Sequence, residues 1–66
     1  MTITINDKPI VLSGGASLQD ALNLAGIAAA GTATAVNNEV VAAPERAEYK
    51  LKDGDKVLII KAFYGG

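Results

Sequence analysis

The sequence predicts one α+β domain over residues 1–66, with a mixed sheet of four to five strands and one main helix packed on one face. Three observations lead to this fold class. Hydrophobic residues make up 50% of the chain and charged residues only 20%, which is the composition of a folded protein. Short alternating or β-branched apolar segments separated by turn formers indicate strands. One segment alone has apolar residues at helical spacing.

The first dozen residues have the pattern of a β-hairpin. Thr2–Ile5 alternates polar and apolar residues, which places Met1 and the two isoleucines on one face of a strand. Asn6–Pro9 is rich in turn formers, and the apolar run Ile10–Leu12 follows it. We therefore expect two strands joined by a turn over Asn6–Pro9.

A helix is predicted to begin after the break at Ser13–Gly15. Ser17 followed by Asp20 fits a capping box, in which the serine oxygen and the acid three residues later each accept a backbone N–H. Gly26 stands where a left-handed residue ends a helix of about two and a half turns. The apolar stripe of this helix would consist of Leu18, Ala21, Leu22 and Ala25.

The middle of the chain predicts a loop and a second hairpin. Residues 27–31 are alanine-rich without a clear period, and we interpret them as the loop that leaves the helix. Asn37-Asn38, which tolerate positive φ, separate two short apolar segments at 34–36 and 39–41. Residues 44–48 begin with proline and predict an irregular or single-turn helical segment.

The last strand is predicted over Lys56–Phe63, after a turn at Asp53-Gly54-Asp55. Because residues 57–60 are consecutively apolar, we expect both faces of this strand to be covered at least in part, as in a central strand. The order strand, strand, helix, strand, strand, short turn, strand, with the last strand central, describes a β-grasp, or ubiquitin-like, fold.

Composition excludes several kinds of function. A chain of 66 residues is too short for a two-domain enzyme, and the absence of Cys and His excludes thiol and imidazole nucleophiles and Cys/His zinc sites. A net charge of −1 predicts no partner among nucleic acids or anionic membranes. The chain has neither a signal-peptide pattern nor a membrane-length apolar run, so we expect a cytoplasmic protein.

Two local motifs resemble binding sites but fit structural roles better. Asp53-Gly54-Asp55 looks like a fragment of a calcium loop, yet the rest of the 12-residue ligand pattern is missing, so we predict a turn and no metal site. Residues 13–17 are glycine-rich before a helix but lack the lysine and the spacing of a phosphate-binding loop. We interpret them as a hinge and a helix cap.

The C-terminal Gly65-Gly66 is the feature that a structural role explains least well. Glycines have no Cβ, so a flexible Gly-Gly tail can enter a narrow active site of another protein and present the Gly66 carboxylate. A carboxylate becomes an acyl donor only after activation, most simply as an acyl-adenylate made with ATP. This chain has no groups to do that itself, so it would be a substrate of other enzymes. The alternative is a frayed terminus without a role.

At these residues the sequence resembles the ubiquitin-like sulfur carrier proteins of thiamine biosynthesis, which share the β-grasp fold with the small subunit of molybdopterin synthase. The similarity covers TITIND, SLQDALNL, AVNNEVV, PER, LKDGDKV and the final GG. It implies that an activating enzyme adenylates Gly66 with ATP, and that a sulfur donor such as a cysteine desulfurase system supplies the thiocarboxylate sulfur. It also implies sulfur delivery to thiazole synthase by a monomeric carrier that is no enzyme and binds no cofactor.

Other interpretations share parts of this pattern: the small subunit of molybdopterin synthase, a protein modifier that forms isopeptides, and a β-grasp interaction module without covalent chemistry. Phe63 and Tyr64 fit anchors for a partner as well as they fit packing on the protein's own sheet. For partner docking we expect the exposed sheet face near the tail, with Lys61 and either Val57 or Ile59. The choice stays open because one residue of register reverses the face.

Overall fold

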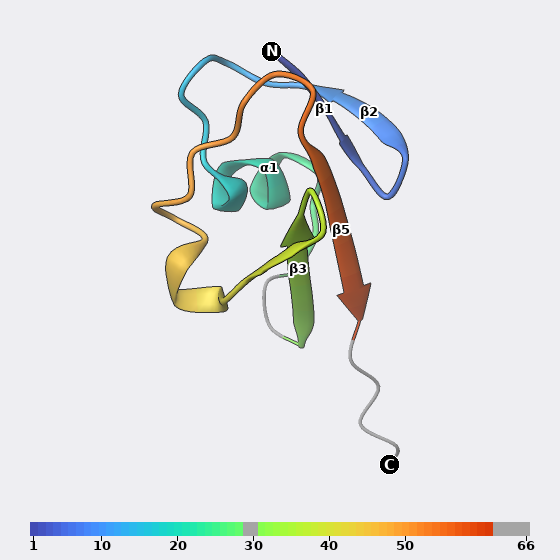
Figure 1. Ribbon diagram of the computed structural model, residues 1–66, viewed down its shortest axis with the longest axis vertical. Helices are drawn as coiled ribbons and strands as arrows, with labels where there is room; N and C mark the ends of the chain where they lie inside the picture. The colour runs from blue at the N-terminus through green and yellow to red at the C-terminus, as the bar shows by residue number, and fades with distance from the viewer. Residues whose placement is uncertain (29–30, 62–66) are drawn as a thin grey trace.

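The computed structural model describes residues 1–28 and 31–61. These form five strands, one α-helix and one 3₁₀ helix, arranged as a single sheet with α1 packed against it (Figure 1). The elements are β1 (Thr2–Ile5), β2 (Lys8–Val11), α1 (Leu18–Leu24), β3 (Thr32–Val36), β4 (Glu39–Val41), η1 (Ala43–Glu45) and β5 (Lys56–Lys61). The strand order is β2-β1-β5-β3-β4, in which β1 and β5 are parallel and all other neighbours antiparallel. The predicted α+β class and the central last strand are confirmed.

The first hairpin has a tighter turn than the sequence predicted. Asn6 and Asp7 have φ values of 49° and 69°, which is the pattern of a two-residue type I′ turn. The expected turn over Asn6–Pro9 was therefore too long, because Lys8 and Pro9 already belong to β2. Since β2 is an edge strand, the missing N–H of Pro9 is tolerated there.

The helix has the predicted cap at each end. At its start the Asp20 N–H donates to Ser17 Oγ (3.1 Å), and the Ser17 N–H donates to the Asp20 carboxylate (2.9 Å). At its end Gly26 has a φ of 70° and donates to the Asn23 carbonyl, while the Ile27 N–H donates to the Leu22 carbonyl at 2.9 Å. This pair of bonds is a Schellman motif.

One member of the predicted helix stripe is misplaced. Leu18, Ala21 and Leu22 are buried, but Ala25 is exposed because the helix ends at Leu24 and Ala25 is its C-cap. The stripe therefore spans only the two turns that face the sheet.

The core is one cluster of buried apolar side chains between α1 and the sheet. Its members are Ile3, Ile5, Leu12, Leu18, Ala21, Leu22, Val36, Val41, Leu51, Val57 and Ile59. They come from β1, α1, β3, β4 and β5, together with Leu12 after β2 and Leu51 before β5. The strand members are those whose side chains point toward the helix, because side chains alternate between the two faces of a strand.

The second hairpin is confirmed, with φ values of 50° and 70° at Asn37 and Asn38. Its first strand, β3, begins at Thr32, two residues earlier than expected, because pairing with β5 continues to the Thr32–Lys61 pair. Of the predicted loop, residues 27, 28 and 31 lie outside helices and strands, and residues 29–30 lie outside the described part of the chain. The proline-led segment forms η1, one turn of 3₁₀ helix.

The expectation that both faces of β5 are covered is wrong. Val57 and Ile59 are buried in the core, whereas Leu58 is 48% and Ile60 58% exposed. Residues 1–28 and 31–61 contain one α-helix, and one helix of 7 residues can cover only one face of the sheet. Residues 62–63 of the predicted strand lie outside the described residues.

A buried arginine that sequence reasoning missed ties the segment after η1 to β3. The Arg46 side chain is 2% exposed; its Nε donates to Thr34 Oγ1 (3.0 Å), and its Nη2 donates to the Thr32 carbonyl (2.7 Å). Thr34 Oγ1 in turn donates to the Val41 carbonyl at 2.9 Å. Because every buried polar side-chain atom of the described residues has a hydrogen-bond partner, the buried charge is accommodated.

Candidate functional site

The residues predicted to carry the chemistry follow β5. Gly66, Gly65, Phe63 and Tyr64 all lie outside the described residues, which end at Lys61. The part of the site that can be described is therefore β5 and the surface beside it.

The strand that leads to these residues is held in the middle of the sheet. On one edge β3 pairs with β5 from Val57 to Lys61, and on the other edge β1 pairs with its first two residues, Lys56 and Val57. In Figure 1 β5 runs lengthwise through the molecule, away from the end where the N-terminus lies. A strand that pairs with neighbours on both edges gives the segment that follows it a fixed starting point.

Exposed apolar side chains gather on the face of the sheet opposite α1. Ala35 is the cross-strand partner of both Leu58 and Val40, and Ala33 is the partner of Ile60, so these residues share one face. Val40 is 81% exposed, beside the exposed Leu58 and Ile60. We call this set, Ala33, Ala35, Val40, Leu58 and Ile60, the open-face patch.

The open-face patch corrects the expected docking residues. The sequence pointed to Val57 or Ile59 for the exposed face near the tail, but both side chains belong to the core. The exposed apolar residues of β5 are Leu58 and Ile60, each one position after a residue that the sequence pointed to. Lys61 is the last residue of β5, and the structure describes its backbone.

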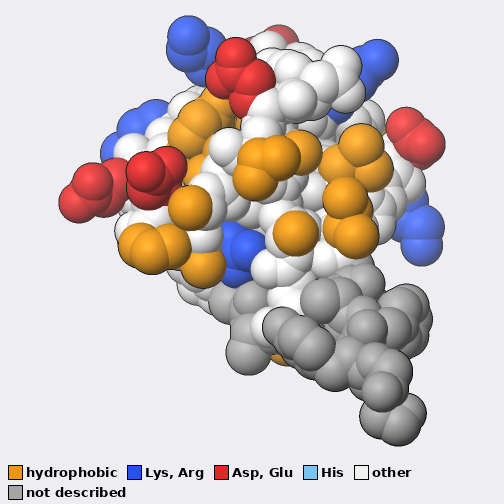
Figure 2. Space-filling model, turned by 60° about the horizontal axis from the view of Figure 1, so that its bottom comes forward, with side chains coloured by type: hydrophobic (Ala, Val, Ile, Leu, Met, Phe, Trp, Pro, Cys, Tyr) orange, Lys and Arg blue, Asp and Glu red, His pale blue; other side chains and the backbone are white. Residues whose placement is uncertain are grey.

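Figure 2 looks at the end of the molecule toward which β5 runs. Hydrophobic side chains are spread over the middle of this view with one basic side chain among them, and most other acidic and basic side chains lie toward its margins. A surface of this kind suits contact with a protein, and it carries no field of one sign that would attract a polyanion.

The acidic turn before β5 has a structural role. Asp53 accepts the Thr2 N–H (2.7 Å), and the nearly buried Asp55 accepts the Lys52 N–H (2.8 Å) and the Asn37 amide (3.0 Å). Gly54 has the φ of 85° that the turn requires. The predicted turn is confirmed; within residues 1–28 and 31–61 no group of three or more acidic, His or Cys side chains could hold a metal ion.

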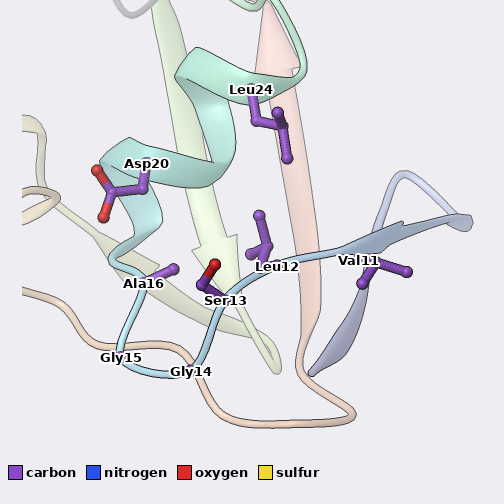
Figure 3. A pocket seen from close by; sticks show the side chains of 8 residues that line it. All are labelled: Val11, Leu12, Ser13, Gly14, Gly15, Ala16, Asp20 and Leu24. Atoms are coloured by element: carbon purple, nitrogen blue, oxygen red, sulfur yellow. The ribbon is translucent and has the colours of Figure 1, made fainter.

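The glycine-rich segment before α1 forms one wall of a shallow depression of about 580 Å³. Figure 3 shows Leu12 and Leu24 pointing toward each other across it, while the Asp20 carboxylate points away to one side. Besides these three, the lining residues are Val11, Ser13, Gly14, Gly15 and Ala16. None is cationic, so this lining offers an anion no positively charged partner. The predicted helix cap at Ser17 is confirmed, whereas the hinge stays a prediction.

The pKa of the Asp20 carboxyl clearly departs from its ordinary value. The Ser17 backbone N–H, and then the Ser17 hydroxyl, hold the pKa of the Asp20 carboxyl below its usual range. The cause is the helix cap, so the shift marks a structural contact.

Among the described helices, none is long and apolar enough to span a membrane.

The profile of the ThiS family matches residues 2–66. The sulfur carrier protein ThiS of Escherichia coli (strain K12) is 29% identical over 66 residues, which is 100% of both chains. The crystal structure of the thiamine biosynthesis protein (ThiS) from Geobacter metallireducens superimposes with a TM-score of 0.84 at 26% identity, covering 100% of each chain. An NMR structure of a thiamine biosynthesis protein from the same organism gives 0.72 at 29% identity, covering 100% of this chain and 87% of that one.

A mixed five-stranded sheet with one helix and a central last strand, matched over its whole length by these structures, defines a β-grasp protein. The chain belongs to the ThiS family, whose profile reaches the final Gly66. Of the interpretations that the sequence left open, this match favours the thiamine sulfur carrier over the molybdopterin synthase subunit, the protein modifier and the non-covalent module.

Proposed function

We propose that this chain is a sulfur carrier protein of thiamine biosynthesis, in which the Gly66 carboxylate is converted to a thiocarboxylate that donates its sulfur for thiazole formation. The observation that carries the proposal is the family match over residues 2–66, which includes the terminal Gly65-Gly66. The protein is a cosubstrate of its partner enzymes and not itself an enzyme.

The chemistry proceeds in three substitutions. A carboxylate oxygen of Gly66 attacks the α-phosphorus of ATP and pyrophosphate leaves, which gives an acyl-adenylate. The terminal sulfur of a donor persulfide then attacks the acyl carbon, and AMP leaves with the bonding electron pair. A thiolate of a partner protein attacks the donor-side sulfur of the resulting acyl disulfide, which forms a new disulfide and releases the Gly66 thiocarboxylate with the bonding electron pair, free to react with the thiazole precursor.

Partners supply the catalytic groups, because the chain contains no Cys and no His. The partners we propose are an adenylating activating enzyme that binds ATP, a sulfur donor such as a cysteine desulfurase system, and a thiazole synthase. The carrier binds no cofactor of its own, and it acts as a monomer when free.

The open-face patch is the surface that we propose for docking to the activating enzyme. Leu58 and Ile60 belong to β5 itself, so a partner seated on them lies beside the strand that continues to Gly66. Phe63 and Tyr64 stand two and three residues after the end of β5 in the sequence and serve as further anchors, while Gly65, without a Cβ, passes through the narrow entrance of the active site.

Thiocarboxylate formation tests the function. The carrier is purified from cells that also make the activating enzyme and the sulfur donor, and its intact mass is measured. We expect a fraction of the wild-type carrier to have the mass of a chain with one oxygen replaced by sulfur. A variant that lacks Gly66, and so still ends in a glycine carboxylate, should show no such fraction. A wild-type mass that never shifts under these conditions would contradict the proposal.

A matched pair of leucine substitutions tests the docking surface. Leu58→Asp puts a charge into the open-face patch, whereas Leu24→Asp puts one on α1, where Leu24 is 64% exposed. We expect Leu58→Asp to raise the KM for the carrier in ATP–pyrophosphate exchange by about tenfold or more, and Leu24→Asp to leave it within about twofold. Equal KM values for the two variants would place the interface elsewhere.

A further inference from the structure

Asn6, in the turn between β1 and β2, binds the backbone of β5 through its side chain. Its Oδ1 accepts the Ile59 N–H at 2.9 Å, and its Nδ2 donates to the Ile59 carbonyl at 3.4 Å. A carboxamide used in this way supplies one acceptor and one donor, as a backbone peptide group of a neighbouring strand would.

This contact extends the support of β5 beyond the end of β1. Parallel pairing between the two strands stops at the Ile5–Val57 pair, and the Asn6 N–H makes the last backbone bond, to the Val57 carbonyl at 2.9 Å. From there β1 turns away into its hairpin. At Ile59 the Asn6 side chain therefore takes the place of a neighbouring strand, while β3 holds the opposite edge as far as Lys61.

The second hairpin contains a matched contact at the other end of the same strand. Asn37 is also the first residue of its turn, with φ of 50° against 49° for Asn6. Its Oδ1 accepts the Lys56 N–H at 3.0 Å, so it holds the beginning of β5. Its Nδ2 donates to the Asp55 carboxylate at 3.0 Å instead of to β5. Asn37 therefore serves as a control that also loses two side-chain hydrogen bonds, but away from Ile59.

The position of Asn6 matters because Ile59 precedes Gly66 by seven residues. Because Ile59 lies two residues before Lys61, the last residue of β5, a change in the direction of β5 at Ile59 changes the direction in which the chain leaves the sheet. Misplacement by about 1 Å already costs as much as a hundredfold in rate when reacting groups must be aligned.

We propose that Asn6 is a positioning residue for the carrier reaction. By holding Ile59 on the edge that β1 leaves, it sets the direction in which the chain continues past Lys61 and aligns the Gly66 carboxylate with ATP in the activating enzyme. This inference rests on the proposed function, and it predicts an effect on turnover rather than on docking.

The test compares Asn6→Gly with Asn37→Gly in ATP–pyrophosphate exchange, with the activating enzyme from the same organism and the full-length carrier. Glycine accepts the positive φ of both turns, so each variant loses the side-chain contact and keeps the turn. We expect Asn6→Gly to lower kcat about tenfold with KM for the carrier within about twofold, and Asn37→Gly to leave both within about twofold. Thermal unfolding of both variants is the control that each is folded at the assay temperature.

An Asn6→Gly kcat within about twofold of wild type overturns the inference, and so does an equal loss in Asn37→Gly, because a general effect of destabilisation would then explain the result. If Asn6→Gly fails to fold, Asn6→Asp replaces the amide donor with an oxygen facing the Ile59 carbonyl. We expect Asn6→Asp to lower kcat as well, and an unchanged kcat overturns the inference. Absence of exchange with the wild-type carrier would instead count against the proposed function.

Discussion

The two faces of the sheet are made by the same strands, but one face packs against α1 and the other is exposed. On the face that α1 covers, Val57 and Ile59 of β5 pack into the core, and on the opposite face Leu58 and Ile60 of the same strand stay exposed. Because successive side chains of a strand point to opposite faces, one apolar run supplies both the core residues that stabilise the fold and the exposed residues that we propose for partner binding. In a chain of 66 residues this arrangement lets the central strand hold the fold together and also carry the proposed interface.

Charge reinforces the difference between the faces. The covered side of the molecule contains the buried Arg46, whose hydrogen bonds to Thr32 and Thr34 join β3 to the segment after η1. The open-face patch contains only alanine, valine, leucine and isoleucine. An exposed apolar cluster on a protein of this size is characteristic of an interaction site.

The sharpest test of the comparison uses two adjacent isoleucines of β5. Ile59→Ala removes a side chain that is 9% exposed and should lower the free energy of unfolding by about 2–5 kcal/mol, because it leaves a cavity in the core. Ile60→Ala should change it by no more than about 0.5 kcal/mol, since that side chain is already in water. Urea unfolding of both variants gives the two values.

Comparable losses in the two isoleucine variants would show that the open face is also covered in solution, for example by self-association. Measuring unfolding at two protein concentrations distinguishes that case, because a dimer becomes more stable as concentration rises and a monomer does not.

A smaller effect is expected at the polar contact of the covered side. Arg46→Leu removes the donors to Thr34 Oγ1 and the Thr32 carbonyl, and we expect a loss of about 2 kcal/mol in the free energy of unfolding. Arg46→Lys keeps the charge but not the planar pair of donors, so it should recover only part of that loss. If the leucine variant is as stable as the wild type, apolar packing rather than hydrogen bonding holds this region.

The smallest effect concerns the cap of the helix that covers the core. Ser17→Ala removes the hydroxyl that accepts the Asp20 N–H and should cost about 1 kcal/mol. The pKa of Asp20 lies below its ordinary value of 3.8 in the folded protein, so its contribution is present above the unfolded-state pKa and is lost as pH falls through the folded-state pKa.

The pH dependence of urea unfolding between about pH 5 and 2 checks this sign. Asp20→Asn should flatten the acid limb of the curve relative to wild type, while Asp7→Asn, at an exposed turn position, provides the control. A wild-type curve that matches that of Asp20→Asn would mean that the carboxylate does not act through the cap.

Features encoded by neighbouring residues could be predicted well. The capping box of Ser17 and Asp20, the left-handed Gly26 and the Asn37-Asn38 turn each depend on local backbone conformation, and the structure has all three. The turn at Asn6-Asp7 is shorter than the sequence predicts, because Pro9 lies on an edge strand, where a proline is acceptable.

Features that depend on distant residues could not be predicted in this way. An unbroken run at residues 57–60 is compatible with a strand covered on both sides, and only the number of helices available to cover the sheet decides otherwise. The roles of Arg46 and Asn6 were missed for the same reason, since their partners lie 12 and 53 residues away. No signal within a short window reveals such pairs.

The sequence by itself determined the α+β class, the order of the elements and the terminal Gly65-Gly66, because propensity, capping and composition act over a few residues or over the chain as a whole. Tertiary structure alone decided which side chains of β5 meet the helix and which remain free for a partner. The physical reason is register: in a strand, a shift of one residue exchanges the two faces, and only the packing of α1 and the pairing with β1 and β3 select between them.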